Sequence, residues 1–410
     1  MGPRTSAVPA SIQRFDTIDV LRGVSILAVI VHHTFLRLLF AGYPMARRVP
    51  PPVAHLLFWN GGNGVTVFFA VSGFLITLTS LRRFGSLREM KPSLFYRIRF
   101  ARIAPLLLLT VAVLSVLALV HAEGFQFGHK NPPLWRAVFS ALTFHLNWLE
   151  ARFGYLPGNW DVLWSLSVEE MFYLFFPLVC LACLPFRRGT ALFLAVLFAF
   201  VFMGPFARTV WTTNEIWQEK SYLGGMDGIA LGCLTALLTH WLARRHGGRW
   251  GRTQNRSLLA LQLAGAAIIA LTAVGPRWFW HLLPGRLDLY GSLLSLATCL
   301  VMLGSVLRQQ ARVRFPPSRL TAPVRWFGRH SYEIYLTHEF VVVWVTLLFV
   351  HLHPNTNPKP GGIAPYQPPL PHMFHWFVAT LLLTAPLGWL TARFVSDPLN
   401  RRLRGARPPS

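Results

Sequence analysis

Hydrophobic residues along this chain occur in runs of about twenty, separated by shorter polar segments. Such a run predicts a helix that crosses a bilayer, because about twenty residues at 1.5 Å each span the ~30 Å hydrocarbon core. The ten strong runs cover roughly 18–41, 62–81, 103–121, 163–184, 190–210, 222–242, 257–274, 287–307, 330–351 and 374–394. The pattern therefore predicts an all-α, polytopic integral membrane protein with about ten transmembrane helices.

Basic residues are distributed unevenly among the segments between these runs. The 410-residue chain has a formal net charge of +24, with 53% hydrophobic and 13% charged residues. With the N-terminus inside, the inside segments hold 26 of the 39 lysines and arginines and the outside segments hold ten. Basic loops concentrate at the cytoplasmic face of membrane proteins. The charge thus indicates topology rather than nucleic-acid binding, and it predicts cytoplasmic N- and C-termini in the cell inner membrane.

One further apolar stretch, 134–149, does not fit this alternation. Counting it as a span would move Arg187 and Arg188 outside and invert every later basic loop. We therefore predict a partly embedded or interfacial helix, with Trp135 and Trp148 at the headgroup level.

The same pattern predicts three parts along the chain. Residues 1–15 form a cytoplasmic leader, 16–395 a single membrane domain, and 396–410 a basic cytoplasmic tail. The proline density of 351–372 predicts an ordered or extended outside loop instead of a helix. The four cysteines lie inside predicted spans, where they fit small apolar packing residues better than a metal or redox site.

The first span carries ionisable residues that lipid contact would make costly. Arg22 and His33 are eleven residues apart, so they share one helix face about 16 Å apart. Asp19 and Arg37 lie near that face. Such a row must face a protein interior or a wet cavity. A purely structural polar network, or snorkelling of Arg22 to the surface, is the alternative.

Further stretches form an ordered set with this first span. They read GVTVFFAVSGFLIT at 64–77, RIRFARIAP at 97–105, WSLSVEEMFYLFFP at 164–177 and GRHSYEIYLTH at 328–338. Together with the first span they resemble the acyltransferase 3 family of integral-membrane O-acyltransferases. The resemblance covers residues 16 to about 395. Because no esterase-like domain follows the last span, the chain is expected to be a stand-alone member.

The family's motifs fall on particular residues of this chain. Its Arg–ten residues–His motif matches Arg22 and His33, and its R-x-x-R matches Arg99 and Arg102. The W-S-L-S-x-E stretch ends at Glu169, and the late motif matches Gly328, Ser331, Tyr332 and His338. The resemblance implies transfer of an acyl group, most simply acetyl, from acyl-coenzyme A to an acceptor hydroxyl. The acceptor would be a glycan, a lipid-linked sugar or a glycosylated metabolite.

The residue chemistry fits that implied task. Coenzyme A carries phosphates, and the planar guanidinium groups of Arg99 and Arg102 match phosphate oxygens two at a time. Arg22 is expected either to hold the same phosphates or to balance negative charge on the thioester oxygen. An alcohol needs a general base during attack, and histidine titrates near working pH. We therefore predict that His33 takes the acceptor's proton, with Glu169 orienting or assisting it.

Neighbouring residues are expected to take other roles. Glu169 and Glu170 begin the fourth span near the outside, where Glu170 is expected to reach headgroup water. Ser331, Tyr332 and His338 are expected to pack or to support the site, and the last two, six positions apart, need not act together. An acyl-histidine intermediate is the less economical route. No metal is expected, because the fifteen histidines include no H-E-x-x-H or comparable ligand set.

A transporter or flippase of a polar substrate is the alternative function. Ten spans with intramembrane charges fit it, but many transporters have two related halves, whereas the charged motifs here concentrate in the first four spans. For the enzyme, the outside segments 122–162 and 351–372 are expected to shape the acceptor site. Trp148, Tyr155 and Trp160 could stack on sugar rings there.

Overall fold

The computed structural model describes residues 15–247, 250–275, 288–310, 318–357 and 362–404, and in these ranges the chain is helical without strands. The predicted leader lies almost entirely outside the described residues. The α-helices are α1 (Asp16–Phe40), α2 (Pro51–Phe58), α3 (Gly61–Phe84), α4 (Pro92–Leu119), α5 (Leu134–Leu142), α6 (Leu146–Phe153), α7 (Leu163–Cys183), α8 (Gly189–Ala207), α9 (Glu215–Lys220), α10 (Tyr222–Arg245), α11 (Arg252–Val274), α13 (Tyr290–Gln310), α14 (Ala322–Arg329), α15 (Ser331–Leu352), α16 (Leu370–Thr391) and α17 (Asp397–Arg404). Short 3-10 turns are η1 (Met45–Arg48), η2 (Leu87–Glu89), η3 (Gly158–Trp160) and η4 (Arg319–Thr321), and one π turn is η5 (Ala392–Ser396).

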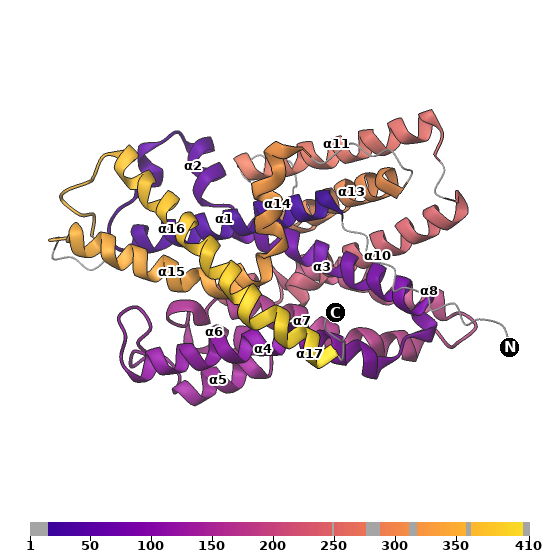
Figure 1. Ribbon diagram of the computed structural model, residues 1–410, viewed down its shortest axis with the longest axis horizontal. Coiled ribbons are helices and arrows are strands. Elements are labelled where there is room, and N and C mark those ends of the chain that lie inside the picture. Colours follow the sequence, from indigo (N-terminus) through magenta and orange to yellow (C-terminus); the bar gives the residue numbers. More distant parts are fainter. Residues whose placement is uncertain (1–14, 248–249, 276–287, 311–317, 358–361, 405–410) are drawn as a thin grey trace.

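Ten helical stretches of the described chain are long and apolar enough to cross a membrane, which confirms the predicted all-α, multi-pass architecture. They contain α1, α3, α4, α7, α8, α10, α11, α13, α15 and α16, and α16 crosses the molecule diagonally in Figure 1.

Three boundaries differ from the sequence-based prediction. Helix α4 begins at Pro92, eleven residues before the predicted apolar run. The run did not include these first turns because they are polar and carry arginines. The segment 134–149 is not among the candidate spans, as predicted, but it divides into two helices, α5 and α6, instead of forming one. The last span continues through the π turn η5 into α17, which packs on α4. Residues up to 404 therefore belong to the helical bundle.

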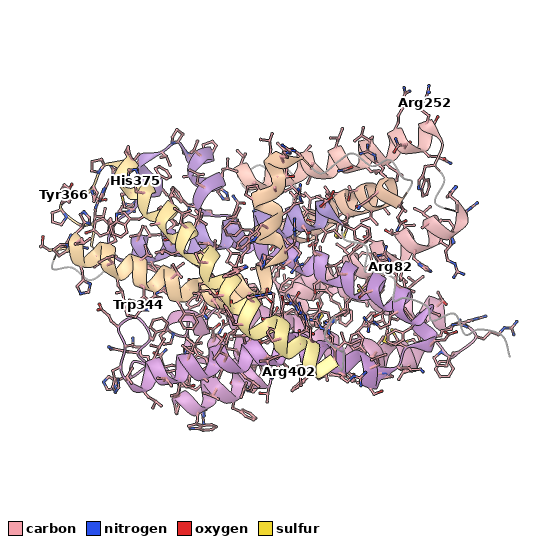
Figure 2. All side chains as sticks on the ribbon, in the orientation of Figure 1. Arg82, Arg252, Trp344, Tyr366, His375 and Arg402 are labelled. Carbon is pink, nitrogen blue, oxygen red and sulfur yellow. The ribbon has the colours of Figure 1, made fainter. Side chains whose placement is uncertain are left out.

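The two ends of the bundle are marked by different side chains in Figure 2. Arg82 and Arg252 lie toward one end of the molecule, and Tyr366 and His375 lie at the other. We call these the basic end and the opposite end. At the opposite end, no helix occurs between His353 and Pro369 in the described part of the Pro-rich segment, as predicted.

Helix α1 runs between these two ends at the centre of the bundle. Close backbone contact holds it against α14, which crosses it in Figure 1. A Cβ on Gly23 would lie 1.9 Å from the Val324 carbonyl oxygen, and one on Gly328 would lie 1.8 Å from the Asp19 oxygen. The glycines of both helices are therefore needed at this crossing.

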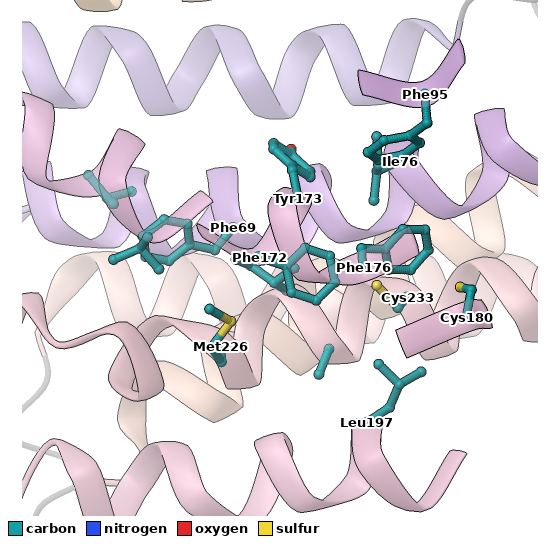
Figure 3. Packing of buried hydrophobic residues seen from close by; sticks show 14 of the residues in the cluster. Phe69, Ile76, Phe95, Phe172, Tyr173, Phe176, Cys180, Leu197, Met226 and Cys233 are labelled. Atoms are coloured by element: carbon teal, nitrogen blue, oxygen red, sulfur yellow. The ribbon is translucent and has the colours of Figure 1, made fainter. Parts of the chain in front are cut away.

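Helices α3 and α10 cross in the same way beside α1. A Cβ on Gly73 would lie 1.9 Å from the Ile229 oxygen, and one on Gly232 would lie 2.1 Å from the Ala70 oxygen. Around this crossing lies an apolar cluster of α3, α7, α8 and α10, in which Phe172 stands next to Phe176 (Figure 3), with ring centroids 5.4 Å apart. The four cysteines are buried and unpaired.

A substitution at this crossing tests the fold. We expect Gly73→Ala to lower the thermal unfolding temperature in detergent, because the added methyl collides with backbone and overpacking typically costs about 1–3 kcal/mol. Gly62→Ala on the same helix is the matched control, since its Cβ meets nothing within 4 Å. It should leave the unfolding temperature unchanged or raise it. Equal effects of the two substitutions would contradict the close crossing of α3 and α10.

Candidate functional site

A cavity of about 980 Å³ extends into the bundle from the basic end. Helices α1, α3, α4, α7, α15 and α17 supply most of its walls. Among the described residues, seven arginines and five carboxylates line it, and the arginines are Arg22, Arg82, Arg83, Arg99, Arg102, Arg329 and Arg404. This excess of fixed cations, inside a volume typical of ligand sites, suits an anionic ligand. We refer to it as the basic cavity.

Ion pairs hold two of these arginines in the cavity wall. Arg99 donates from Nη2 to Glu170 Oε1 at 2.9 Å and lies over the Tyr173 ring at 3.7 Å. Arg102 is 3.1 Å from a Glu333 oxygen. Each guanidinium has five N–H donors, and each of these two arginines pairs with one carboxylate. Both therefore keep N–H donors that can bind a ligand.

Arg22 differs from Arg99 and Arg102. Its side chain lines the cavity and, among the described residues, has no carboxylate within ion-pairing distance. Two carboxylates of the same cavity are paired with other arginines, since Asp19 lies 3.6 Å from Arg329 and Glu333 lies next to Arg102. An unpaired cation at this depth is costly unless an anion or water reaches it.

Glu169 also lines this cavity, two turns into α7. The sequence-based prediction that Glu169 and Glu170 lie near the outside is wrong, because the structure places both among the arginines of the basic cavity. Glu170 is paired with Arg99 and does not reach headgroup water. The physical reason is that η3, directly before α7, is buried beside α15, where Asn159 donates to the Leu336 oxygen at 2.7 Å, instead of lying at the surface.

The cavity ends against a partition of aromatic and aliphatic side chains. Tyr335 donates to the Val162 oxygen at 3.0 Å and is 2.6 Å from Ser165 Oγ. Its ring stands edge-on to Phe68, with centroids 6.2 Å apart. The cavity ends at Val65 on α3, at Ser165 on α7 and at Leu336 on α15. The deep end of the basic cavity is therefore largely apolar.

His33 lies beyond this partition, at the opposite side from Arg22. Its Nδ1 is 2.5 Å from Glu339 Oε1, and Arg37 donates to the other oxygen of the same carboxylate. The Glu339 side chain is only 3% exposed, whereas that of His33 is 20% exposed. With Nδ1–H donating to Glu339, the Nε2 of His33 carries a lone pair and is free to accept a proton.

His338 completes this cluster. Its ring centroid is 5.2 Å from that of His33, and its Nδ1 is 2.8 Å from the Tyr335 oxygen. Its Nε2 is buried without a hydrogen-bond partner among the described residues. Tyr335 belongs to the partition and His338 follows it by three residues, about 4.5 Å along the helix. The cluster and the cavity are thus separated by roughly one helical turn.

The late motif is consequently divided between the two regions. Ser331 and Tyr332 line the basic cavity, where the Tyr332 hydroxyl donates to the Ile103 oxygen at 2.8 Å. His338 lies in the His33 cluster. The prediction that Tyr332 and His338 need not act together agrees with this division.

Donor atoms of His33, His338 and Glu339 all lie within 4.8 Å of one another, a spacing that could hold a metal ion. No metal was expected from the sequence. The surroundings fit a cation poorly, because the Arg37 guanidinium already occupies one Glu339 oxygen and His33 the other. This arrangement resembles a histidine–carboxylate pair oriented for proton transfer.

Sequence reasoning missed Glu339, and it placed one aromatic residue wrongly. Glu339 directly follows the motif histidine, so an acid inside an apolar span was the available signal; its pairing with His33, 306 positions away, was not readable. Trp160 cannot stack on a sugar because it is fully buried against Phe127. Trp148 and Tyr155 are exposed, at 49% and 56%.

Comparisons with known proteins agree with the motifs. The chain is 22% identical over 405 residues to the O-acetyltransferase OatA of Staphylococcus aureus, covering 94% of this chain and 57% of that protein. It is 24% identical over 366 residues to the peptidoglycan O-acetyltransferase OatA of Listeria monocytogenes, covering 83% and 51%. The chain thus spans little more than half the length of these relatives. No solved structure matches it.

The family profile described as an acyltransferase domain matches residues 15–393, from the start of α1 to the π turn. That range contains the basic cavity, the partition and the His33 cluster, and it covers almost all of the described chain. The protein is therefore a member of the acyltransferase 3 family, as its ordered motifs predicted.

Proposed function

We propose that this protein is a membrane O-acyltransferase that moves an acetyl group from acetyl-CoA, or another short acyl-CoA, to a hydroxyl of a glycan or glycosylated molecule. The proposal rests on two residues of α1: Arg22, which makes no ion pair among the described residues, and His33, whose imidazole is oriented by a carboxylate. Arg22 faces the basic cavity, and His33 meets Glu339 about three turns further on. The names of both relatives describe O-acetyl transfer, which supports the same reaction.

The donor would bind in the basic cavity. Arg22, Arg99 and Arg102 can neutralise the phosphates of coenzyme A, with guanidinium groups that match phosphate geometry. The thioester arm would then extend toward the apolar deep end at Phe68 and Tyr335, which suits a small acyl group. Displacement of these two side chains would bring the thioester to His33, one helical turn away.

At the His33 cluster the reaction would proceed by general base catalysis. His33 Nε2 takes the proton of the acceptor hydroxyl as its oxygen attacks the thioester carbonyl carbon. The carbon–sulfur bond breaks, and the departing thiolate receives that proton from His33. Glu339 holds the imidazole and stabilises its protonated form, and Arg37 keeps Glu339 ionised. An acyl-histidine is not required.

Glu169 is better placed to act on the donor than on His33. Glu169 lies in the basic cavity, on the same helix as Ser165 of the partition. The carboxylate beside His33 is that of Glu339, although the sequence-based prediction had placed Glu169 there. Its predicted catalytic role therefore stays a proposal, with the donor side as its place.

The orientation follows from the charge asymmetry. We place the basic end, with both chain termini, in the cytoplasm, where acyl-CoA is available. The opposite end would then face the outside of the inner membrane, where a glycan acceptor is found. A transporter would fit the ten spans equally well, but it gives no reason for a histidine held by a carboxylate beyond a basic cavity.

Donor binding tests the role of the unpaired arginine. We expect Arg22→Gln to weaken binding of labelled acetyl-CoA to the detergent-purified protein by about tenfold or more, the ~1.4 kcal/mol loss of one charge-assisted contact. Because Arg22 makes no ion pair within the described part of the chain, the unfolding temperature should not fall. Arg188→Gln, an exposed arginine at the same end, is the charge-matched control. Equal affinities for both variants would contradict a donor site in the basic cavity.

Acetyl transfer tests the His33 cluster. We expect His33→Gln and Glu339→Gln to lower formation of base-labile acetyl esters on envelope saccharide by about 10²–10⁴-fold, the usual contribution of a positioned base. Binding of acetyl-CoA should persist. Glu123→Gln is the control, because Glu123 forms a similar but exposed pair with His351 at 3.9 Å. Normal transfer by His33→Gln would disprove the mechanism.

A further inference from the structure

A second buried charge network lies at the opposite end of the bundle, and the mechanism above does not use it. Lys220 of α9 is 1% exposed and fully surrounded by partners. Its Nζ lies 2.9 Å from Glu150 Oε2 and 2.5 Å from Asp161 Oδ1. It also lies over the ring of Tyr155, 4.4 Å from the centroid. One lysine therefore fixes two carboxylates and an aromatic ring.

Asp161 is the member of this network that reaches the surface. Its side chain is 28% exposed, whereas that of Glu150 is fully buried. Lys220 binds its Oδ1, and Oδ2 has no partner among the described residues. An ionised carboxylate has only lone pairs to offer, so this oxygen requires a donor such as water or a hydroxyl.

Tyr155 and Glu219 extend the same surface. The Tyr155 hydroxyl donates to Glu219 Oε2 at 3.3 Å, and 56% of the tyrosine is exposed. Partial burial, with the Glu219 carboxylate as the next cause, raises the pKa of Tyr155 to about 12. The phenol therefore stays neutral at working pH and presents an aromatic face next to two carboxylates.

This surface adjoins the His33 cluster. Val162, directly after Asp161, accepts a hydrogen bond from the Tyr335 hydroxyl at 3.0 Å, and the centroid of the Tyr335 ring lies 5.8 Å from that of His338. Anchoring by η3 explains the proximity: Asn159, two residues before Asp161, is buried and donates to the Leu336 oxygen at 2.7 Å, just before His338 on α15. The chain is thereby fastened beside the partition, on the side away from the basic cavity.

From this arrangement we infer that Asp161, Glu219 and Tyr155 form a binding site for a sugar ring of the acceptor, which presents one ring hydroxyl to His33. The inference rests on the proposed function and adds the residues and the chemical class of acceptor that it leaves open. Asp161 and Glu219 accept hydrogen bonds from hydroxyls of the ring edge, and Tyr155 packs against its C–H face.

The charges of this surface also disfavour a phosphate group next to His33. Lys220 is shared between two carboxylates, and Arg37 is taken by Glu339, so the surface beside His33 has an excess of negative charge. A phosphate would be repelled by Asp161 and Glu219. The part of the acceptor next to His33 is therefore an uncharged polyhydroxylated ring, even if a lipid phosphate is attached elsewhere.

Binding to a saccharide array tests the inference whichever acceptor the protein uses. The full chain in lipid nanodiscs is applied as wild type, Asp161→Asn and Tyr155→Ala, with acetyl-CoA affinity measured in parallel. Tyr155→Ala leaves both ion pairs of Lys220 in place. It therefore tests the sugar site without the loss of an ion pair that could unfold the protein. Trp211→Ala is the control, because this aromatic residue after α8 is also exposed, at 51%, and stacks on Phe206 instead of contacting the Lys220 network.

We expect the wild type and Trp211→Ala to bind at least one saccharide equally, and the other two variants to bind it tenfold or more weakly. Their acetyl-CoA affinity should stay within twofold of the wild type. Absence of saccharide binding by a wild type that binds acetyl-CoA, or undiminished binding by Tyr155→Ala and Asp161→Asn, would overturn the subsite and leave the proposed function standing. Saccharide binding without acetyl-CoA binding would instead overturn the proposed function and keep the subsite.

Discussion

The structure depends on one constraint: a charge inside an apolar bundle must find its partner on another helix. Arg37 of α1 meets Glu339 of α15, Arg99 of α4 meets Glu170 of α7, and Arg208 next to α8 meets Asp227 of α10 at 2.9 Å. Each pair fixes how two helices face each other, since moving either would leave an uncompensated charge. Polar residues thus determine the arrangement of helices that apolar packing alone would leave variable.

The same constraint identifies the site through its exceptions. Arg22 is a cation without a carboxylate partner in the described chain, and His338 buries an Nε2 that has no hydrogen-bond partner there. Both lie on or next to α1, on either side of the Phe68–Tyr335 partition. In the proposed function, a donor bound by the cations on one side and a base oriented by a carboxylate on the other would transfer a small group between two compartments. The partition would keep water from joining them.

Features that depend on local composition, such as the spans, could be predicted from the sequence. Contacts between helices that are far apart in the sequence could not. Ten apolar runs and the spacing of Arg22 and His33 predicted the spans and the shared face of α1, because hydropathy and helical period are local properties. The partner of His33 was not predictable, because Glu339 reaches it only through the packing of α15 on α1. The depth of Glu169 and the burial of Trp160 were misjudged for the same reason, since both depend on η3 folding into the bundle.

The most direct test is whether donor and acceptor act from opposite sides of the membrane. Acetyl-CoA is sealed inside proteoliposomes and a saccharide acceptor is added outside, and a second preparation receives both outside. Because the protein inserts in both orientations, the outer solution meets the basic end of some molecules and the opposite end of the others. We expect acetyl ester only when the membrane separates donor from acceptor. Ester formed with both on the same side would contradict a donor cavity and an acceptor site at opposite ends of α1.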